Sequence, residues 1–181
     1  MRAYIWVAGA ILLIAVVGCG KKDVVVTDTE GNKVTVTPGA GDNNKVTVEG
    51  KDGKATVTGN GKDATMTMEG PKGSVTTGGG VEVSEAELGL PYYPGAEKGN
   101  STRSDTADGA MYTVTLNTTD AVDKVAAFYK GKMAGAESVQ TDTGGKPMVM
   151  LMKKDGKDER NVHIQKADGK TMIIVVHVIK K

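Results

Sequence analysis

The fold of the first half of the chain follows from residues 45–77, KVTVEGKDGKATVTGNGKDATMTMEGPKGSVTT. Val or Met alternates here with Thr or a charged residue, and short runs containing Gly, Asn or Asp separate the alternating units. Val48, Val57, Met66 and Val75 recur every nine residues. Period-two alternation is typical of half-buried strands, and the Gly-containing runs are typical of tight turns. The pattern predicts an antiparallel meander.

The same alternation occurs upstream at 33–37, so we expect a β-repeat region over residues 24–83. From Gly20 to Glu87 the chain has no Leu, Ile or aromatic residue, so this region has little with which to build a thick core. Two other structures remain open: a β-solenoid, because near-regular repeats are also its signature, and a poorly ordered stalk. The run 59–63, GNGKD, fits one copy of a calcium-binding nonapeptide repeat, but a hairpin turn accounts for it, and we predict no metal.

Composition changes near Leu88. The segment 84–91 predicts a short linker or a single helical turn, and residues 92–181 hold most of the Leu, Ile and aromatic residues that follow the N-terminal stretch. Alternation predicts strands at 111–116, 147–153, 160–166 and 171–179, with a weaker strand at 137–141.

A helix is expected between them, with an N-cap at Thr118 to Asp120 and an end near Ala134. Its apolar face consists of Val122, Val125, Phe128 or Tyr129, and Met133. The predicted fold class is therefore α+β and mainly β: an N-terminal Val/Thr β-repeat meander followed by an antiparallel sheet with one helix packed on it.

The N-terminus carries a processing signal. Arg2 precedes an apolar run over residues 3–17, and the run ends at Val16-Val17-Gly18-Cys19, which contains the only cysteine. This segment resembles the lipobox of bacterial lipoproteins. The resemblance implies a signal peptide at 1–18 and a lipidated tether at 19–23, with Cys19 acylated and the protein held on a membrane through its lipid. Because Gly20 follows the cysteine, it implies the outer membrane facing the periplasm in a diderm host, and otherwise the outer face of the cell membrane.

The C-terminal half also carries motifs. Residues 90–96, LPYYPGA, begin it, and residues 120–130 contain Phe-Tyr-Lys within the predicted helix. These motifs resemble a domain of uncharacterised bacterial envelope proteins. The resemblance implies no activity, no cofactor and no catalytic residue.

Charge and motifs exclude several functions. Removal of residues 1–18 takes away one of the 23 basic residues, so 22 basic residues face 22 acidic ones, and no charged block suggests nucleic acid. His163 is expected on the polar face of its strand, whereas His177 is expected to be a hydrogen-bonded core histidine or a strand-end residue. Asp105 and Asp108 are expected to form a turn in a polar loop. We therefore predict no catalytic residue and no metal site.

Tyr92 and Tyr93 are the candidate partner contacts, although their position ahead of Pro94 favours packing of the incoming segment against the sheet. Two functions remain. The first is a noncatalytic envelope lipoprotein that binds a protein or cell-wall partner, with the repeats as spacer or second surface. The second is an envelope enzyme with an unrecognised Asp, Tyr or His site.

Overall fold

The structure is a computed structural model that describes residues 23–39, 44–142, 144 and 147–181. The predicted signal peptide at 1–18 and Cys19 lie outside the described residues, so the lipobox stays a prediction.

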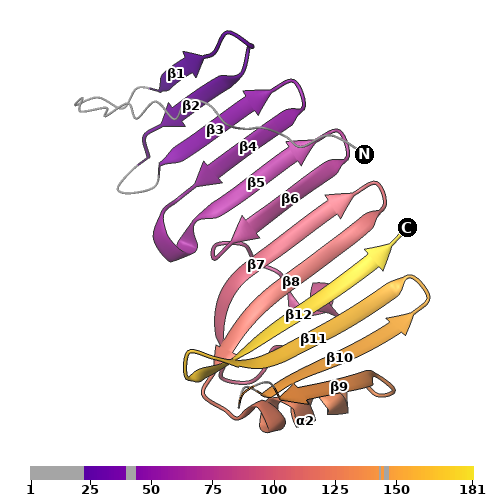
Figure 1. Ribbon diagram of the computed structural model, residues 1–181. Helices are drawn as coiled ribbons and strands as arrows, with labels where there is room; N and C mark the ends of the chain where they lie inside the picture. The colour runs from indigo at the N-terminus through magenta and orange to yellow at the C-terminus, as the bar shows by residue number, and fades with distance from the viewer. Residues whose placement is uncertain (1–22, 40–43, 143, 145–146) are drawn as a thin grey trace.

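Strands dominate the described chain (Figure 1). The elements are β1 (Val24–Thr27), β2 (Lys33–Thr37), β3 (Lys45–Gly50), β4 (Gly53–Thr58), the 3-10 helix η1 (Gly61–Asp63), β5 (Thr65–Gly70), β6 (Gly73–Gly78), α1 (Glu85–Leu88), β7 (Glu97–Thr106), β8 (Gly109–Thr118), α2 (Val122–Lys132), β9 (Glu137–Asp142), β10 (Pro147–Asp155), β11 (Asp158–Ala167) and β12 (Lys170–Lys180). The prediction of a mainly β chain is confirmed. The sequence had indicated one packed helix, whereas both α1 and α2 contact the sheet.

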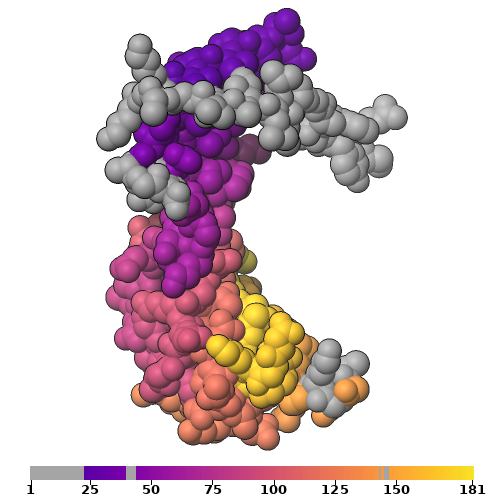
Figure 2. All heavy atoms as spheres, turned by 90° about the vertical axis from the view of Figure 1, so that its left-hand side faces the viewer, coloured from indigo at the N-terminus to yellow at the C-terminus, as the bar shows by residue number. Residues whose placement is uncertain are grey.

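All twelve strands form one antiparallel sheet in the order β1-β2-β3-β4-β5-β6-β7-β8-β12-β11-β10-β9. The sheet therefore continues across the predicted linker at 84–91, because β7 returns to pair with β6. The described strands therefore form one sheet rather than the two consecutive sheets that the sequence suggested. The chain leaves the sheet after Gly78, forms α1, and comes back at Glu97. Figure 2 shows the sheet bowed into a crescent, with the early strands at one tip and the orange strands at the other.

Local sequence explains the elements that the alternation missed. β7 carries Lys98, Arg103 and Asp105 among Ser and Thr, and its register shifts between Lys98 and Ser101, so no clean period-two pattern appears. Asp105 consequently lies in a strand rather than in the expected loop; Asp108 does lie in the turn that follows.

Helix α2 begins later than predicted. Its N-cap is Ala121, which makes no side-chain cap, while Thr118 still belongs to β8 and Asp120 bonds elsewhere. Asp123 in its first turn and Lys130 in its last turn complement the helix dipole. Of the two aromatic residues proposed for its inner face, Tyr129 is the buried one.

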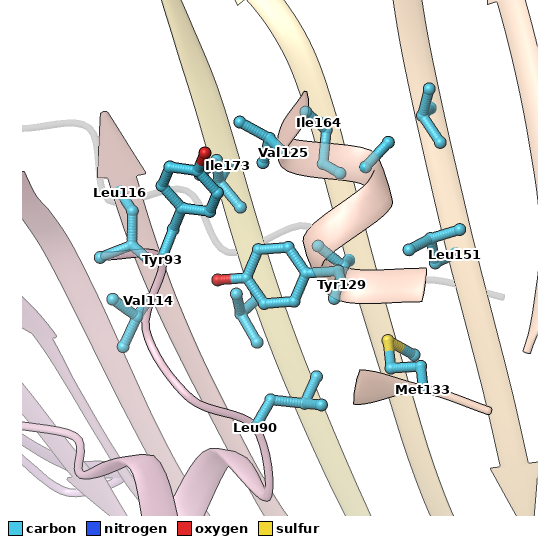
Figure 3. Packing of buried hydrophobic residues seen from close by; sticks show 14 of the residues in the cluster. Leu90, Tyr93, Val114, Leu116, Val125, Tyr129, Met133, Leu151, Ile164 and Ile173 are labelled. Carbon is cyan, nitrogen blue, oxygen red and sulfur yellow. The ribbon is translucent and has the colours of Figure 1, made fainter. Parts of the chain in front are cut away.

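The hydrophobic core lies on one side of the second half of the sheet, under α2, α1 and the residues that flank α1 between β6 and β7 (Figure 3). Tyr129 and Val125 of α2 face the strand residues Leu151, Ile164 and Ile173. The fully buried apolar strand residues are Val114, Leu116, Val149, Leu151, Val162, Ile164, Ile173 and Val175. None belongs to β1–β6, so hydrophobic packing stabilises the second half of the sheet, and the first half depends mainly on its hydrogen-bond ladders.

This asymmetry predicts different costs for truncating an apolar side chain. Leu151→Ala removes a fully buried side chain and is expected to cost about 2–5 kcal/mol of unfolding free energy. Val57→Ala, at a position 39% exposed, is expected to cost less than about 1 kcal/mol. Urea unfolding followed by circular dichroism measures both values. Equal losses would contradict a core confined to the second half.

Candidate functional site

The sheet has two chemically different faces, which the strand register defines. We call the side that carries α1 and α2 the helix face, and the opposite side the open face. Within β1–β6 the charged strand residues Lys33, Lys45, Glu49, Lys54 and Glu69 all share the helix face. Glu49 and Lys54 are directly opposite each other and form an ion pair of 3.4 Å.

Threonines form a continuous row along the same face. One threonine from each of the strands β2–β6 is the cross-strand neighbour of the next: Thr35, Thr47, Thr56, Thr67 and Thr76. The hydroxyls of Thr67 and Thr76 lie 3.2 Å apart and hydrogen bond across the strands. Such pairs favour one register, because a one-residue slip would move every threonine to the other face.

The open face is uncharged over its two central rows in nine neighbouring strands, β1–β8 and β12. Its residues there are Val24, Val26, Val34, Val36, Val46, Val48, Ala55, Val57, Met66, Met68, Val75, Thr77, Thr102, Ser104, Met111, Thr113, Val176 and Val178. Val48 and Met68 are each 43% exposed and Met111 is 38% exposed. The surface is mainly apolar, with Thr77, Thr102, Ser104 and Thr113 among its Val, Met and Ala residues, and an exposed apolar surface is typical of a contact site.

A buried polar cluster lies on the helix face at His177. The ring is 4% exposed; its Nδ1 lies 2.5 Å from the carbonyl oxygen of Glu87, and its Nε2 lies 3.0 Å from Asp158 Oδ2. A carbonyl and a carboxylate only accept hydrogen bonds, so a ring protonated on both nitrogens satisfies both partners. Asp158 also accepts a hydrogen bond of 2.9 Å from Arg160. The prediction of a hydrogen-bonded core histidine is confirmed.

This cluster holds α1 against the sheet. Ser84 and Glu87 form a capping box, and Arg103 of β7 donates to the Glu87 carboxylate. Gly89 ends the helix with φ 61°, and a Cβ there would lie 2.7 Å from Arg160 Nε, so a larger residue would push the guanidinium away. Leu88 is fully buried beneath this turn, so the predicted linker is part of the core.

The pKa values of the two carboxyl groups follow from these contacts. Partial burial alone would raise the pKa of Asp158, but the hydrogen bond and charge of His177, together with Arg160, outweigh it and lower that pKa. The backbone and hydroxyl of Ser84, aided by the Arg103 charge, lower the pKa of Glu87. Both carboxylates are therefore stabilised in their ionised form by the fold.

Tyr93 is 5% exposed, and its hydroxyl donates a 2.6 Å hydrogen bond to Asp120. Burial, with the hydrogen bond and charge of Asp120, raises the pKa of Tyr93 to about 12. The ring lies edge-on to Phe128 with centroids 5.2 Å apart. These contacts show that Tyr93 packs the segment before β7 against α2. Because its ring is buried, we no longer count Tyr93 among the candidate partner contacts.

Tyr92 is half-buried beside a shallow pocket of about 560 Å³ formed by residues 82–87 with Tyr92, Lys98 and Arg103. Lys98 Nζ lies 4.1 Å from the centroid of the Tyr92 ring, and the Tyr92 hydroxyl donates to the carbonyl of Val83. Its predicted role as a partner contact stays a prediction.

The second histidine lies on the other side of the sheet. His163 belongs to the open face of β11 with Asn161 and Gln165, opposite the buried Val162 and Ile164, as the alternation predicted. No hydrogen bond or ion pair joins the His163 ring to another of the described residues. The sequence separated the two histidines by face, but the partners of His177 come from 19 and 90 residues away, which no local pattern indicates.

Within the described ranges, no group of three or more His, Cys, Asp or Glu residues is placed to hold a metal ion. No described helix has the length and hydropathy needed to cross a bilayer. Comparison with protein-family models, with curated proteins and with solved structures finds no match.

The two histidines form a matched pair for a stability test. His177→Ala removes the ring from the Glu87 carbonyl and leaves Asp158 with Arg160 as its partner, and we expect it to lower the unfolding free energy by about 2–4 kcal/mol. His163→Ala is expected to change it by less than about 0.5 kcal/mol. Urea unfolding at neutral pH measures both; a similar loss in the two variants would refute a structural role specific to His177.

The lowered pKa of Asp158 predicts an acid-dependent contribution to stability. Because the pKa is lower in the folded chain, the stabilisation is present above the unfolded-state pKa and is lost as pH falls through the folded-state pKa. Asp158→Asn is therefore expected to flatten the fall of unfolding free energy between about pH 5 and pH 2. Thermal unfolding across this range provides the measurement. An unchanged slope in the variant would show that Asp158 contributes nothing to it.

Proposed function

We propose that this chain is a noncatalytic cell-envelope lipoprotein that is anchored through Cys19 and acts as a binding or structural module. The strand order is the observation that carries the proposal. Val24 begins the edge strand β1 only five residues after Cys19, and a chain of that length spans at most about 17 Å. The edge at β1 is thus tied closely to the lipid.

The layered half of the protein lies at the other end of the same sheet. Seven strand-to-strand steps separate β1 from β8, which amounts to about 34 Å at the usual spacing of about 4.8 Å. We propose that the Val/Thr repeats form a spacer that holds the α-helix-covered half away from the membrane. A continuous hydrogen-bond ladder suits this role better than a flexible linker, because it fixes a distance.

The open face is the surface that we assign to the partner. Its two central rows are mainly apolar, uncharged over nine strands and partly exposed, and they run from the β1 edge into the layered half. Tyr92 beside the shallow pocket is a second candidate contact. The partner class that fits is another envelope protein or a cell-wall component.

Two observations support a noncatalytic role. His177 has both ring nitrogens bound and is almost fully buried, so it is poorly placed to exchange protons with a substrate. Asp105 and Asp108, which the sequence placed together in one polar loop, are a strand residue and a turn residue. For localisation we propose the outer membrane facing the periplasm in a diderm host, and otherwise the outer face of the cell membrane.

Lipidation is tested with Cys19→Ala in the native host. The variant is expected to keep its signal segment and to take up no labelled fatty acid, because the thioether linkage to lipid cannot form. Gel mobility and acyl labelling measure these properties. Fatty-acid label on the variant would refute anchoring at this residue.

The contact surface is tested with two adjacent, exposed positions of β4 that lie on opposite faces. A photo-crosslinking amino acid in place of Val57 reports on the open face, and the same group in place of Thr58 reports on the helix face. Irradiation of intact cells is expected to give a defined adduct from position 57 and none from position 58. Equal adducts, or none from position 57, would argue against the open face as the contact surface.

A further inference from the structure

Seven of the nine methionines lie on the open face. These are Met66, Met68, Met111, Met148, Met150, Met152 and Met172; of the others, Met133 is buried beside α2, and Met1 lies outside the described residues. Strand positions on an exposed face favour β-branched residues, and Val occupies many of them in this chain. The unbranched thioether is therefore not required by the strand itself.

Three of these methionines are concentrated in one strand. Met148, Met150 and Met152 occupy alternate positions of β10, and all three are half-buried. Alternate residues of a strand are about 6.8 Å apart along it, and each methionine has three rotatable side-chain bonds. Their sulfur atoms can therefore turn toward a common point above the central residue, Met150.

An imidazole stands beside the same point. His163 of β11 is the direct cross-strand partner of Met150, which places their Cβ atoms about 4.5–5.5 Å apart. In contrast to His177, no described residue binds the His163 ring by a hydrogen bond or an ion pair. One nitrogen of a neutral imidazole is thus available as a ligand.

We propose that Met148, Met150, Met152 and His163 bind a soft monovalent cation, Cu⁺ or Ag⁺. Thioether sulfur is a soft, neutral ligand that selects Cu⁺ over Mg²⁺, Ca²⁺ or Mn²⁺, and imidazole also suits copper. The four proposed ligands are neutral, so the charge of a bound cation is not neutralised by them. A monovalent cation therefore binds at a lower electrostatic cost than a divalent one. Carboxylates lie at the end of the cluster, where Glu137 is opposite Met152, and not around its centre at Met150.

This proposal is independent of lipidation and goes beyond a contact surface. The prediction of no metal site rests on the positions of histidines and carboxylates. It does not cover a site formed by methionine thioethers. The other methionine pair on the open face, Met66 and Met68 of β5, has Ala55, Val57, Val75 and Thr77 as cross-strand neighbours and no imidazole. It provides a matched control within the same protein.

The test uses the full chain with Cys19→Ala, which has no thiol because Cys19 is the only cysteine. Silver nitrate is titrated in chloride-free buffer while the methionine methyl groups are followed by ¹H–¹³C NMR and the heat by calorimetry. We expect one Ag⁺ per chain and shifts of the Met148, Met150 and Met152 methyls that saturate together. A parallel anaerobic titration uses Cu⁺ in competition with a chromophoric chelator, and a third uses Zn²⁺.

Substitutions assign the ligands. Changing Met148, Met150 and Met152 together to Leu, which conserves volume, is expected to weaken Ag⁺ binding at least tenfold, and Met150→Leu alone and His163→Gln are each expected to weaken it. The control Met66→Leu with Met68→Leu is expected to bind as the parent does. Thermal unfolding verifies that each variant is folded. If the triple variant is unfolded, the Ag⁺ affinities of Met150→Leu and His163→Gln decide the test.

The outcomes separate clearly. Binding of Ag⁺ and Cu⁺ that is lost in the β10 variants and kept in the β5 control supports the site, and binding of Ag⁺ alone narrows it to that ion. No Ag⁺ binding at micromolar concentration, equal shifts of all the open-face methionines, or tighter binding of Zn²⁺ than of Ag⁺ would overturn the proposal.

Discussion

The pairing of β6 with β7 is the constraint on which the rest of the structure depends. Strands β1–β6 contain no fully buried apolar side chain, so they lack the hydrophobic packing that usually stabilises a sheet. Their backbone groups are instead templated by β7, which belongs to the half covered by α1 and α2. The packed half therefore stabilises the repeats through successive strand pairings that begin with β7 and β6.

Once one continuous sheet exists, the alternation of side chains divides the chemistry between two faces. Along β1–β6 the helix face has the threonine row and the paired charges of Glu49 and Lys54, whereas the open face has Val and Met. A register slip of one residue would mix the two sets. The separation of charge from apolar side chains over the central rows of β1–β8 and β12 gives the open face a physical basis for contact.

The same sheet gives its two histidines opposite roles. His177 faces inward, where the carbonyl of Glu87 and the carboxylate of Asp158 take both of its ring nitrogens and hold α1 in place. His163 faces outward beside Met150 with its ring unbound by the described residues. The two histidines lie in adjacent strands of one hairpin, β11 and β12. His177 has a structural role, and His163 is available to a ligand.

Most strands, and the side chains that share a face within them, can be predicted from the sequence because period-two alternation is a local property. It predicted most strands, the inner face of α2 and the opposite faces of His163 and Ile164. It failed at β7, whose bulge and charged residues hide the alternation, and at the start of α2, where Asp120 bonds to Tyr93 instead of capping the helix. The return of β7 to β6, the contact of Glu87 with His177 and the pairing of Met150 with His163 become visible only in the folded chain. These contacts depend on the order and register of strands distant in sequence, and such long-range pairing is set by burial and hydrogen bonding over the whole sheet, which no local pattern encodes.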